Sequence, residues 1–329
     1  MPHLSSRDFM RRTNILWSEF GRYRSLSFSC AIRRVTEEVL MPWMPEVFTA
    51  PLADARRVEA RREEDAASVN DAVAYYEGIM ANEPEALVRS FAARQPVLDD
   101  PRVGYVEGAR ELRAFVNGTA DWLRERDAVV ENVALTRTPT RTIEEVVLHL
   151  LADDGGRVEL PVAIVADRNP DRTLKAIRVY HSMWPLTGEH RVRPPLLPED
   201  PSRHAEGAPG IYQRALAEGD LKGIVATFEP EGYAREPSGA AYLHRSVEGL
   251  RTLYEHLFAN GGGIGLEHCT LTDDGVRCAI EYNCIRWGVT DIPPQVGVAV
   301  YERGSGRLLA AARIYDDVEP PSVSDTSSG

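Results

Sequence analysis

The segment Ala176-Ile177-Arg178-Val179-Tyr180 recurs 135 residues later as Ala311-Ala312-Arg313-Ile314-Tyr315. The match extends backwards without a gap, because Val162-Ala163-Ile164-Val165-Ala166-Asp167-Arg168 aligns with Gly297-Val298-Ala299-Val300-Tyr301-Glu302-Arg303. These runs are rich in β-branched and apolar residues, so they predict that each copy ends in two strands of one hairpin. A repeat of this length is a whole fold rather than a solenoid unit, which indicates one domain duplicated in tandem.

Nearer the start of each copy the offset becomes 136, and polar positions recur along with apolar ones. The aligned residues are Tyr76, Pro101, Glu131, Leu135 and Thr136 in the first copy and Tyr212, Pro237, Glu267, Leu271 and Thr272 in the second. A polar set that is carried along with the core is where we look for function.

The composition limits the classes of partner. With 329 residues, 43% of them hydrophobic and 27% charged, the chain is long enough for two cores of about 100–150 residues each. The net charge of −12 argues against a nucleic-acid partner, since binding a polyanion normally needs a basic face. Only two basic residues are lysines, Lys175 and Lys222, a bias typical of a GC-rich bacterial genome.

The cysteines and the apolar runs indicate the compartment. Four cysteines, at positions 30, 269, 278 and 284, show neither paired metal-ligand spacing nor the density of a secreted disulfide scaffold. No apolar run reaches the roughly 18 residues of a membrane span, and no basic segment leads into an apolar one at the N-terminus. We therefore expect a soluble cytoplasmic protein that does not bind membranes.

The repeat and the composition divide the chain into five segments. We expect an N-terminal extension at 1–67, a first domain at 68–190, a Pro-rich linker at 191–206, a second domain at 207–318 and a disordered tail at 319–329. The extension is either a docking arm or a variable, partly disordered addition.

Both copies predict the same order of elements: two helices, a strand, a third helix and four strands. In the first copy the helices lie near Val73–Met80, Pro84–Phe91 and Ala109–Arg126, and the strands at Pro96–Asp99, Val129–Thr136, Thr142–Ala152, Arg157–Asp167 and Thr173–Met183. In the second copy the first elements lie at Pro209–Glu218, Leu221–Phe228, Tyr233–Arg235 and Val247–Asn260, and four strands follow. Three helices on one face of a curved antiparallel sheet form an α+β cone that encloses a cavity.

Several weak features recur in both copies in the same order. They are the helix tyrosines, the helix ends Phe91-Ala92 and Phe228-Glu229, the acidic-Pro pairs Asp100-Pro101 and Glu236-Pro237, and the final Arg-aliphatic-Tyr strands. In these features both copies resemble the NTF2-like superfamily, in its SnoaL and ketosteroid-isomerase-like branch, from about residue 69 to 318. The resemblance implies two tandem cones related by a pseudo-twofold axis and packed sheet against sheet as an intrachain pseudo-dimer.

The resemblance also implies catalytic residues. In ketosteroid-isomerase-like enzymes the acid of an Asp-Pro pair acts as general base and a tyrosine on the first helix faces it as hydrogen-bond donor. Asp100 follows Tyr76 by 24 residues and Glu236 follows Tyr212 by 24, so both roles can be placed in each copy. A carboxylate in an apolar cavity loses solvation, so its pKa rises towards neutral and it can accept a proton. The alternative is that both acids are exposed turn residues before proline.

The chain departs from the ketosteroid isomerases at one position. Where they carry a second, protonated aspartate, the two copies read Val162 and Gly297, which makes steroid isomerisation doubtful. Glu131 and Glu267 stand instead on the second strand, and two-domain epoxide hydrolases of polyether biosynthesis are similar in carrying a Tyr, acid, acid set in each copy. The alternative is that both glutamates face outwards.

Histidines and two further polar residues are weaker candidates. SnoaL-type cyclases use a histidine and an aspartate in the pocket, and four histidines fall on or near predicted strands: His149, His181, His244 and His268. None recurs between the copies, so an ordinary surface or core role is the alternative for each. Glu281 and Asn283 share the polar face of a strand whose other face is apolar, and that polar face lines either the pocket or the solvent.

The sequence predicts no cofactor. No His, Cys or acidic set has the spacing of a metal site, and no glycine fingerprint follows a strand. The leading hypothesis is a cofactor-independent acid/base enzyme of secondary metabolism that acts on a hydrophobic, polyketide- or terpenoid-like small molecule as isomerase, cyclase, dehydratase or epoxide hydrolase. The competing hypothesis is a non-catalytic small-molecule-binding or association module of the same fold.

Overall fold

A computed structural model describes residues 75–92, 95–153, 155–239 and 242–321. Both repeat copies belong to one compact unit of the chain. The expected N-terminal extension at 1–67 lies outside the described residues, and so do positions 322–329 of the expected tail.

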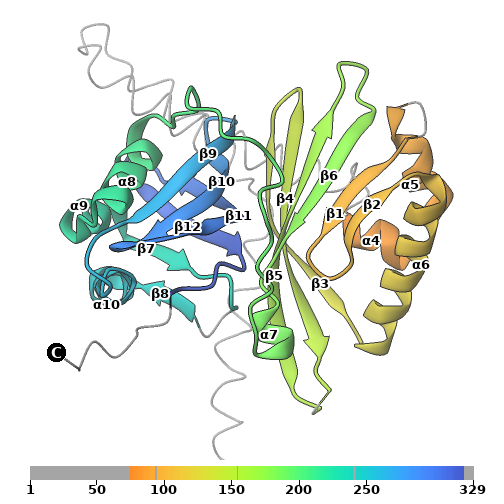
Figure 1. The fold of residues 1–329 in the computed structure, drawn as a ribbon, viewed down its shortest axis with the longest axis horizontal. Helices are drawn as coiled ribbons and strands as arrows, with labels where there is room; N and C mark the ends of the chain where they lie inside the picture. Colours follow the sequence, from red (N-terminus) through yellow and green to blue (C-terminus); the bar gives the residue numbers. More distant parts are fainter. Residues whose placement is uncertain (1–74, 93–94, 154, 240–241, 322–329) are drawn as a thin grey trace, which may run out of the picture. The chain divides into compact units, whose positions relative to one another are not determined.

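The first copy consists of three helices and a six-stranded sheet (Figure 1). The helices are α4 (Tyr75–Met80), α5 (Pro84–Ser90) and α6 (Ala109–Glu125); the strands are β1 (Val97–Asp100), β2 (Gly104–Glu107), β3 (Val129–Arg137), β4 (Arg141–Leu151), β5 (Arg157–Arg168) and β6 (Leu174–Tyr180). The strand order is β2-β1-β6-β5-β4-β3, and only the β1–β6 pair is parallel. A short helix, α7 (Trp184–Thr187), follows the last strand.

The second copy repeats this arrangement. Its helices are α8 (Gly207–Glu218), α9 (Leu221–Ala226) and α10 (Ser246–Leu257); its strands are β7 (Phe228–Arg235), β8 (Leu243–Arg245), β9 (Ile264–Asp273), β10 (Arg277–Trp287), β11 (Thr290–Arg303) and β12 (Leu309–Asp316). The strand order is β8-β7-β12-β11-β10-β9, with β7 and β12 parallel. The predicted tandem α+β organisation is confirmed at the level of two six-stranded sheets.

Each copy has one strand more than the sequence predicted, namely β2 and β8. In the first copy the carboxylate of Asp100 accepts hydrogen bonds from the backbone N–H groups of Arg102 (2.9 Å) and Val103 (3.1 Å), which turns the chain back on itself. Gly104 continues the reversal with a φ of 95°, a conformation that favours glycine. The strand that follows has only four residues, too few to give a periodic pattern.

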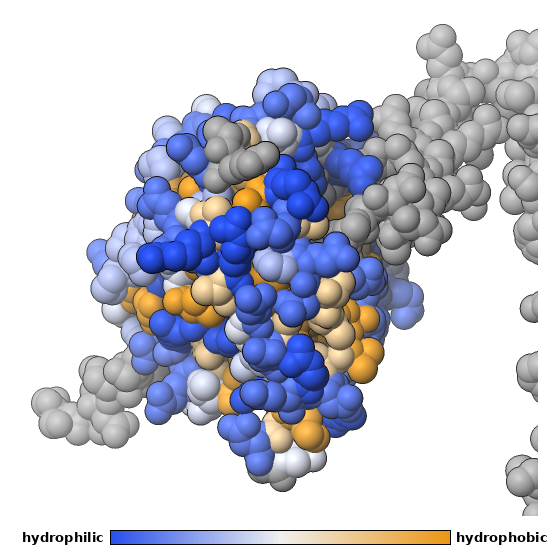
Figure 2. All heavy atoms as spheres, turned by 90° about the vertical axis from the view of Figure 1, so that its right-hand side faces the viewer, coloured by the Kyte–Doolittle hydropathy of each residue, from blue (hydrophilic) through white to orange (hydrophobic). Residues whose placement is uncertain are grey.

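The core of each copy lies between its helices and its sheet. On α6, apolar residues at helical spacing, among them Leu112, Phe115 and Leu123, pack against sheet residues such as Val146 and Leu160. A second core of the same kind contains Leu250 and Tyr254 of α10. The outer face of the first copy is mostly hydrophilic, with apolar residues in small scattered areas (Figure 2).

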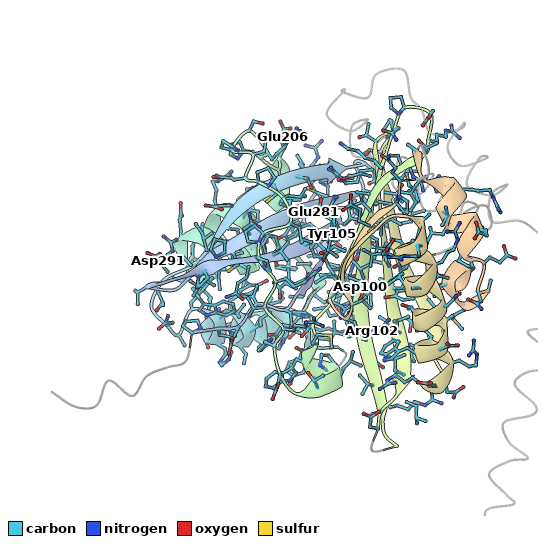
Figure 3. The ribbon with its side chains drawn as sticks, turned by 45° about the vertical axis from the view of Figure 1, so that its right-hand side comes forward. Asp100, Arg102, Tyr105, Glu206, Glu281 and Asp291 are labelled. Atoms are coloured by element: carbon cyan, nitrogen blue, oxygen red, sulfur yellow. The ribbon has the colours of Figure 1, made fainter. Side chains whose placement is uncertain are left out.

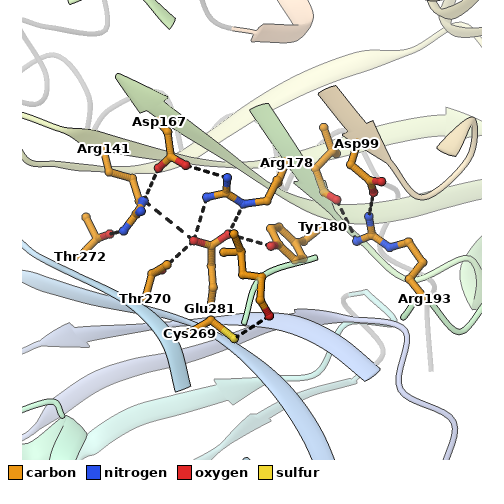
Figure 4. Close-up of polar contacts among 12 residues, drawn as sticks. Asp99, Arg141, Asp167, Arg178, Tyr180, Arg193, Cys269, Thr270, Thr272 and Glu281 are labelled. Carbon is orange, nitrogen blue, oxygen red and sulfur yellow. Dashed lines mark hydrogen bonds and ion pairs between the residues drawn. The ribbon is translucent and has the colours of Figure 1, made fainter. Parts of the chain in front are cut away.

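The opposite faces of the two sheets share a third, smaller core. It combines Ile143, Ala163, Val165 and Tyr180 of the first copy with Ala279, Val296, Val298, Val300 and Tyr315 of the second. Buried ion pairs flank it: Arg178 donates to Glu281 at 2.6 and 3.0 Å, and Arg313 donates to Glu145 at 2.5 and 2.9 Å. Glu281 lies between the two sheets (Figure 3) and within a network that includes Arg141 and Asp167 (Figure 4).

The Pro-rich linker between the copies is fastened along both sheets. Arg193 donates to Asp99 at 2.5 Å and to the carbonyl of Val179 at 2.9 Å, while its own carbonyl accepts from the N–H of Val296 at 3.3 Å. Leu196 packs against the third core. These contacts fix the linker segment against both copies.

Candidate active site

A cavity of about 1180 Å³ lies in the first copy, between α4, α5, α6 and strands β3 to β6. Its wall is largely apolar; Ile79, Leu87, Val116, Leu135, Ile164 and Leu174 contribute to it. Its volume is slightly above the usual range of small-molecule sites, and both apolar and polar side chains line it.

Two polar groups on this wall have unsatisfied atoms. The Glu144 carboxylate on β4 accepts a hydrogen bond from the backbone N–H of Tyr75 through Oε2, at 3.1 Å. Its Oε1 atom and the Tyr75 phenol oxygen are both buried, and neither has a hydrogen-bond partner among the described residues. Both residues line the cavity, so an acid and a phenol belong to its wall.

Burial sets the protonation of this pair. Loss of solvation raises the pKa of Glu144 from 4.5 to about 7; the hydrogen bond from Tyr75 opposes the rise and the charge of Glu77 adds to it. Burial, followed by the charge of Asp100, raises the pKa of Tyr75 well above its ordinary value. Near neutral pH Glu144 can therefore both accept and release a proton, while Tyr75 stays a hydrogen-bond donor.

The predicted pair Tyr76 and Asp100 lies in the same region, behind this wall. Both are 3% exposed, and burial together with the charge of Asp100 raises the pKa of Tyr76. No hydrogen bond joins them: Asp100 uses Oδ1 for the turn described above, and Tyr76 belongs to the core. Arg102, beside Asp100 (Figure 3), donates to Thr119 on α6 at 2.8 Å.

His181 is the one predicted histidine close to this group. It is buried, and loss of solvation lowers its pKa although the nearby charge of Asp100 opposes this. Its Nδ1 lies 3.1 Å from the carbonyl oxygen of Ser182. Fold topology thus brings a histidine and an aspartate together from β1 and the end of β6.

Glu131 lies away from the cavity. It stands on β3 opposite Val147, on the sheet face that does not carry the helices, and is exposed. Its Oε2 lies 2.8 Å from Nε2 of His149, another predicted candidate.

In the second copy the predicted residues Tyr212, Glu236 and Glu267 do not form one group. The hydroxyl groups of Tyr212 and Tyr254 are hydrogen-bonded at 2.8 Å within the core. Glu236 pairs with His244 at 2.6 Å, so Tyr212 and Glu236 have separate partners. Glu267 is half-buried on β9, whose neighbouring residues Leu266 and His268 face α8.

The core of the second copy is filled where the first is hollow. Strand register equates Ala166, which pairs with Ile177, with Tyr301, which pairs with Ala312 at the same repeat offset. Tyr301 is fully buried, its ring centroid lies 5.0 Å from that of Tyr212, and its hydroxyl accepts a hydrogen bond from Gln213. The register likewise equates Glu144 with Ile280.

A smaller hollow of about 360 Å³ lies at the edge of the second copy, between α8 and β9. Gln213 and His268 line it, and they are already hydrogen-bonded to each other at 3.2 Å. His268 also contacts the carbonyl of Arg203 at 3.0 Å. Its polar groups are thus largely used within the protein.

Glu281 and Asn283 line neither the pocket nor the solvent. Both are 2% exposed and lie on the face between the sheets, where Glu281 binds Arg178 and Asn283 donates to the carbonyl of Leu197 at 3.3 Å. The other face of this strand, with Cys278, Ile280, Tyr282 and Cys284, is in the core as predicted.

Sequence reasoning missed Glu144 and Tyr75, and the repeat itself contained the signal. Aligning the copies puts an acid against Ile280 and a small residue, Ala166, against Tyr301. A charge at one core position and a smaller side chain at another indicate a cavity, whereas residues shared by both copies do not.

Within the described part of the chain, no group of three or more His, Cys, Asp and Glu residues is arranged to hold a metal ion. Among the described helices, none combines the length and the apolar character that crossing a membrane requires.

Comparisons with known proteins give a fold-level likeness. No family model matches the chain, and no curated protein matches it. Among solved structures it is similar to an NTF2-like protein of unknown function from Cytophaga hutchinsonii (15% identity, 32% of this chain and 90% of that one, TM-score 0.28). It is also similar to a SnoaL-like polyketide cyclase from Shewanella putrefaciens, so described provisionally (12% identity, 33% and 77%, TM-score 0.30).

A third similar structure is an epoxide hydrolase/cyclase-like enzyme with a role in pyran ring formation in the polyether salinomycin (18% identity, 37% and 90%, TM-score 0.27).

Proposed function

We propose that this protein is a cofactor-independent acid/base enzyme whose first copy binds a hydrophobic small molecule. The observation that carries the proposal is the pair of unsatisfied buried atoms, Glu144 Oε1 and the Tyr75 hydroxyl, on the wall of one apolar cavity. A buried polar atom without a partner costs free energy, so its presence in a cavity favours a ligand that satisfies it.

The chemistry follows from these two groups. Glu144 takes a proton from carbon or from a nucleophilic hydroxyl group or water, and returns it at a second position of the substrate. Tyr75 donates a hydrogen bond to the oxygen on which negative charge develops. Isomerisation, cyclisation, dehydration and epoxide opening all consist of such proton transfers, and substrates of polyketide or terpenoid type suit the apolar wall.

The other predicted residues receive supporting roles in this proposal. Asp100, with Tyr76 and His181, forms a buried set whose charge helps to keep Tyr75 protonated. Asp100 is also the second candidate base, because it shares the region of both tyrosines. Four predicted residues transfer no proton in this mechanism: Glu131, Tyr212, Glu236 and Glu267.

For the second copy we propose an association role. The reciprocal ion pairs and the shared third core support an intrachain pseudo-dimer with a pseudo-twofold relation, in which the filled copy stabilises the hollow one. In this proposal the domains are 68–190 and 207–318, each a cone of three helices on a curved sheet, joined by the linker at 191–206.

The test is to incubate a host metabolite extract with wild-type protein and with the Glu144→Gln variant, and to compare the products by mass spectrometry. We expect a product that forms only with wild type: one water gained indicates epoxide opening, one lost indicates dehydration, and none indicates isomerisation or cyclisation. Glu131→Gln is the matched control, since that glutamate is exposed on the neighbouring strand, and it should retain activity.

Asp100→Asn distinguishes the two candidate bases. If Asp100→Asn abolishes product and Glu144→Gln does not, the base is Asp100 as first predicted. If no extract shows a product while one compound co-purifies with all variants, the competing function, a small-molecule-binding module, replaces catalysis.

A further inference from the structure

Charges of opposite sign stand at one equivalent position near the edges of the two sheets. Asp99 on β1 pairs with Arg178, and Arg235 on β7 pairs with Arg313, the repeat counterpart of Arg178. Strand register therefore equates Asp99 with Arg235. The first copy carries a carboxylate at this position and the second carries a guanidinium group.

The neighbouring edge strands repeat this reversal. Glu107 on β2 lies opposite Val97, and Arg245 on β8 lies opposite Tyr233, the counterpart of Val97. Residues opposite each other point to one face of a sheet, and so do residues two apart on a strand. Arg235, two residues after Tyr233, and Arg245 are therefore diagonal neighbours about 7–8 Å apart on one face.

In the first copy the acid at this position has a partner. The linker residue Arg193 donates to Asp99 at 2.5 Å (Figure 4) and to the carbonyl of Val179 at 2.9 Å. Its guanidinium carbon lies 5.3 Å from the ring centroid of Tyr180. A guanidinium group over a tyrosine ring, with a carboxylate beside it, thus forms a complete arrangement.

In the second copy the guanidinium group is present but the acid is missing. The guanidinium carbon of Arg235 lies 5.1 Å from the ring centroid of Tyr315, the counterpart of Tyr180. Arg235 is 8% exposed; its Nη2 donates to the Tyr315 hydroxyl, and its buried Nε has no hydrogen-bond partner. In the part of the chain that the structure describes, Arg235 forms no ion pair with an acid.

Arg245 extends this arrangement towards the solvent. It is exposed, its guanidinium carbon lies 4.9 Å from the ring centroid of Tyr233, and among the described residues it has no hydrogen bond or ion pair. The acid that Tyr315 contacts, Glu145, is already bound by two nitrogens of Arg313. Two oriented guanidinium groups therefore lack an acid, and a buried charged donor without a partner costs free energy.

We propose that Arg235 and Arg245 form a binding site for an oxyanion, a carboxylate or phosphate group of a small molecule. The bound group takes the position towards Arg235 that Asp99 has towards Arg193 in the first copy. Guanidinium groups bind such oxyanions through two parallel hydrogen bonds, and the tyrosine rings hold both groups in place before binding. The site goes beyond the proposed function, because it lies in the second copy and neither arginine lines the cavity.

Occupancy should strengthen the contact between the copies. Arg235 donates to the Tyr315 hydroxyl, and that hydroxyl donates to Glu145 of the first copy. The two arginines come together only where β7 is paired with β8, so the anion binds the folded chain and not the unfolded one. Binding therefore raises the stability of the protein by mass action.

The test measures anion binding to the full-length protein by isothermal titration calorimetry, together with the midpoint of thermal unfolding. Inorganic phosphate and citrate are the probes, and sodium chloride at equal ionic strength is the reference. We expect at least one probe to bind and to raise the midpoint above its value in chloride. Binding of both probes would show that the site takes oxyanions generally, whereas binding of one would assign the class to phosphates or to carboxylates.

Substitution of either arginine separates this site from general salt effects. Arg235→Met and Arg245→Met should each weaken binding about tenfold, since hydrogen bonds to a charged group are worth that factor. Kosmotropic anions also stabilise proteins by exclusion from the surface, but that effect persists in both variants. Arg251→Met is the control, because it removes a charge from an exposed position on α10 and should bind the probes as wild type does.

The absence of calorimetric binding of either probe to wild type would overturn the inference. Binding that both arginine variants leave unchanged would do the same, because the anion would then lie elsewhere. Arg245→Met decides alone if Arg235→Met does not fold, since Arg245 is exposed; unchanged binding in that variant would also overturn the inference.

Discussion

Arg313 on β12 and Glu145 on β4 form a two-pronged ion pair between the two copies, with Nε–Oε2 and Nη2–Oε1 distances of 2.5 and 2.9 Å. Their side chains are 2% and 0% exposed. Burial acts to raise the pKa of Glu145, but the charge and hydrogen bonds of Arg313 hold it below the ordinary value. Tyr315 donates a further bond at 2.7 Å, so the buried carboxylate is fully satisfied.

Removing one partner of this pair should destabilise the protein strongly. We expect Arg313→Met to lower the free energy of unfolding by about 3–5 kcal/mol, because it leaves a buried carboxylate without its counter-charge. Urea denaturation at neutral pH measures this. Arg124→Met is the control, since Arg124 and Asp121 form an exposed pair and the change should stay within about 0.5 kcal/mol.

The double variant Arg313→Met, Glu145→Leu tests the physical reason. With both charges removed, the carboxylate of Glu145 is no longer buried without a counter-charge, and Glu302, the other partner of Arg313, keeps its ion pair with Arg277 at 3.2 Å. Most of the lost stability should therefore return. A double variant as unstable as Arg313→Met would show that the loss comes from packing instead of from the orphaned carboxylate.

Asp317 should stabilise the segment that follows the last strand of the first copy, since its carboxylate binds four groups there. Its Oδ1 accepts from Ser182 Oγ at 2.6 Å and contacts His190 Nδ1 at 2.9 Å; its Oδ2 accepts the N–H groups of Met183 at 2.9 Å and Arg191 at 2.6 Å. Asp317→Asn replaces an accepting oxygen with a donor, so we expect a loss of about 2–3 kcal/mol.

Hydrogen exchange locates this effect. The amides of Met183 and Arg191 should exchange faster in Asp317→Asn than in wild type, because their acceptor is lost. Asp291→Asn, at an exposed position without a described side-chain contact, should change neither rate. Unchanged exchange at both amides in Asp317→Asn would contradict the role of Asp317.

Much of the fold could be predicted because the same order of helices and strands can be derived twice, once from each copy. Helices α5 and α6 and the four late strands of the first copy have the predicted bounds to within three residues. Strands β2 and β8 escaped prediction, since runs of four and three residues are too short to give a period of two. Their pairing depends on the turns before them.

The site was harder to predict, because the residues that recur in both copies are those that hold the two copies together, and the cavity occurs in one copy. Glu145 with Arg313, and Glu281 with Arg178, recur and serve the contact between the sheets. Glu144 is the residue before Glu145 on the same strand, so it faces the cavity instead. No rule of spacing tells which of two adjacent glutamates meets a hollow, because the hollow is created by side-chain volume on other strands.

Stability should depend on pH through Glu144. Its pKa is raised from 4.5 to about 7 in the folded state, so the native protein binds more protons than the unfolded chain between these values. The contribution of Glu144 to stability is therefore highest below about pH 4.5, falls as pH rises from about 4.5 to 7, and is constant above that. The fall is on the order of 3 kcal/mol.

The Glu144→Gln variant isolates this contribution. Burial also raises the pKa of Asp316, to about 6, so its contribution to stability likewise decreases as the pH rises. Asp316 is present in both proteins, so this contribution cancels in the difference between them. We expect the stability of wild type relative to Glu144→Gln, measured by urea denaturation from pH 4 to 8, to decrease between about pH 4.5 and 7 and to be constant above that. A difference that does not vary with pH would mean that Glu144 titrates normally.

A reciprocal exchange of Ala166 and Tyr301 separates the hollow copy from the filled one. Ala166→Tyr places a ring in the cavity, so it should abolish ligand binding while the free energy of unfolding changes by less than about 1.5 kcal/mol, since the ring enters space that is already open. Tyr301→Ala empties a fully buried site and should cost about 3–5 kcal/mol while ligand binding persists. Retention of compounds from the host metabolite extract measures binding, and urea denaturation measures stability. If Ala166→Tyr binds ligand like wild type, the cavity of the first copy is not the site; if Tyr301→Ala loses binding without losing stability, the site belongs to the second copy.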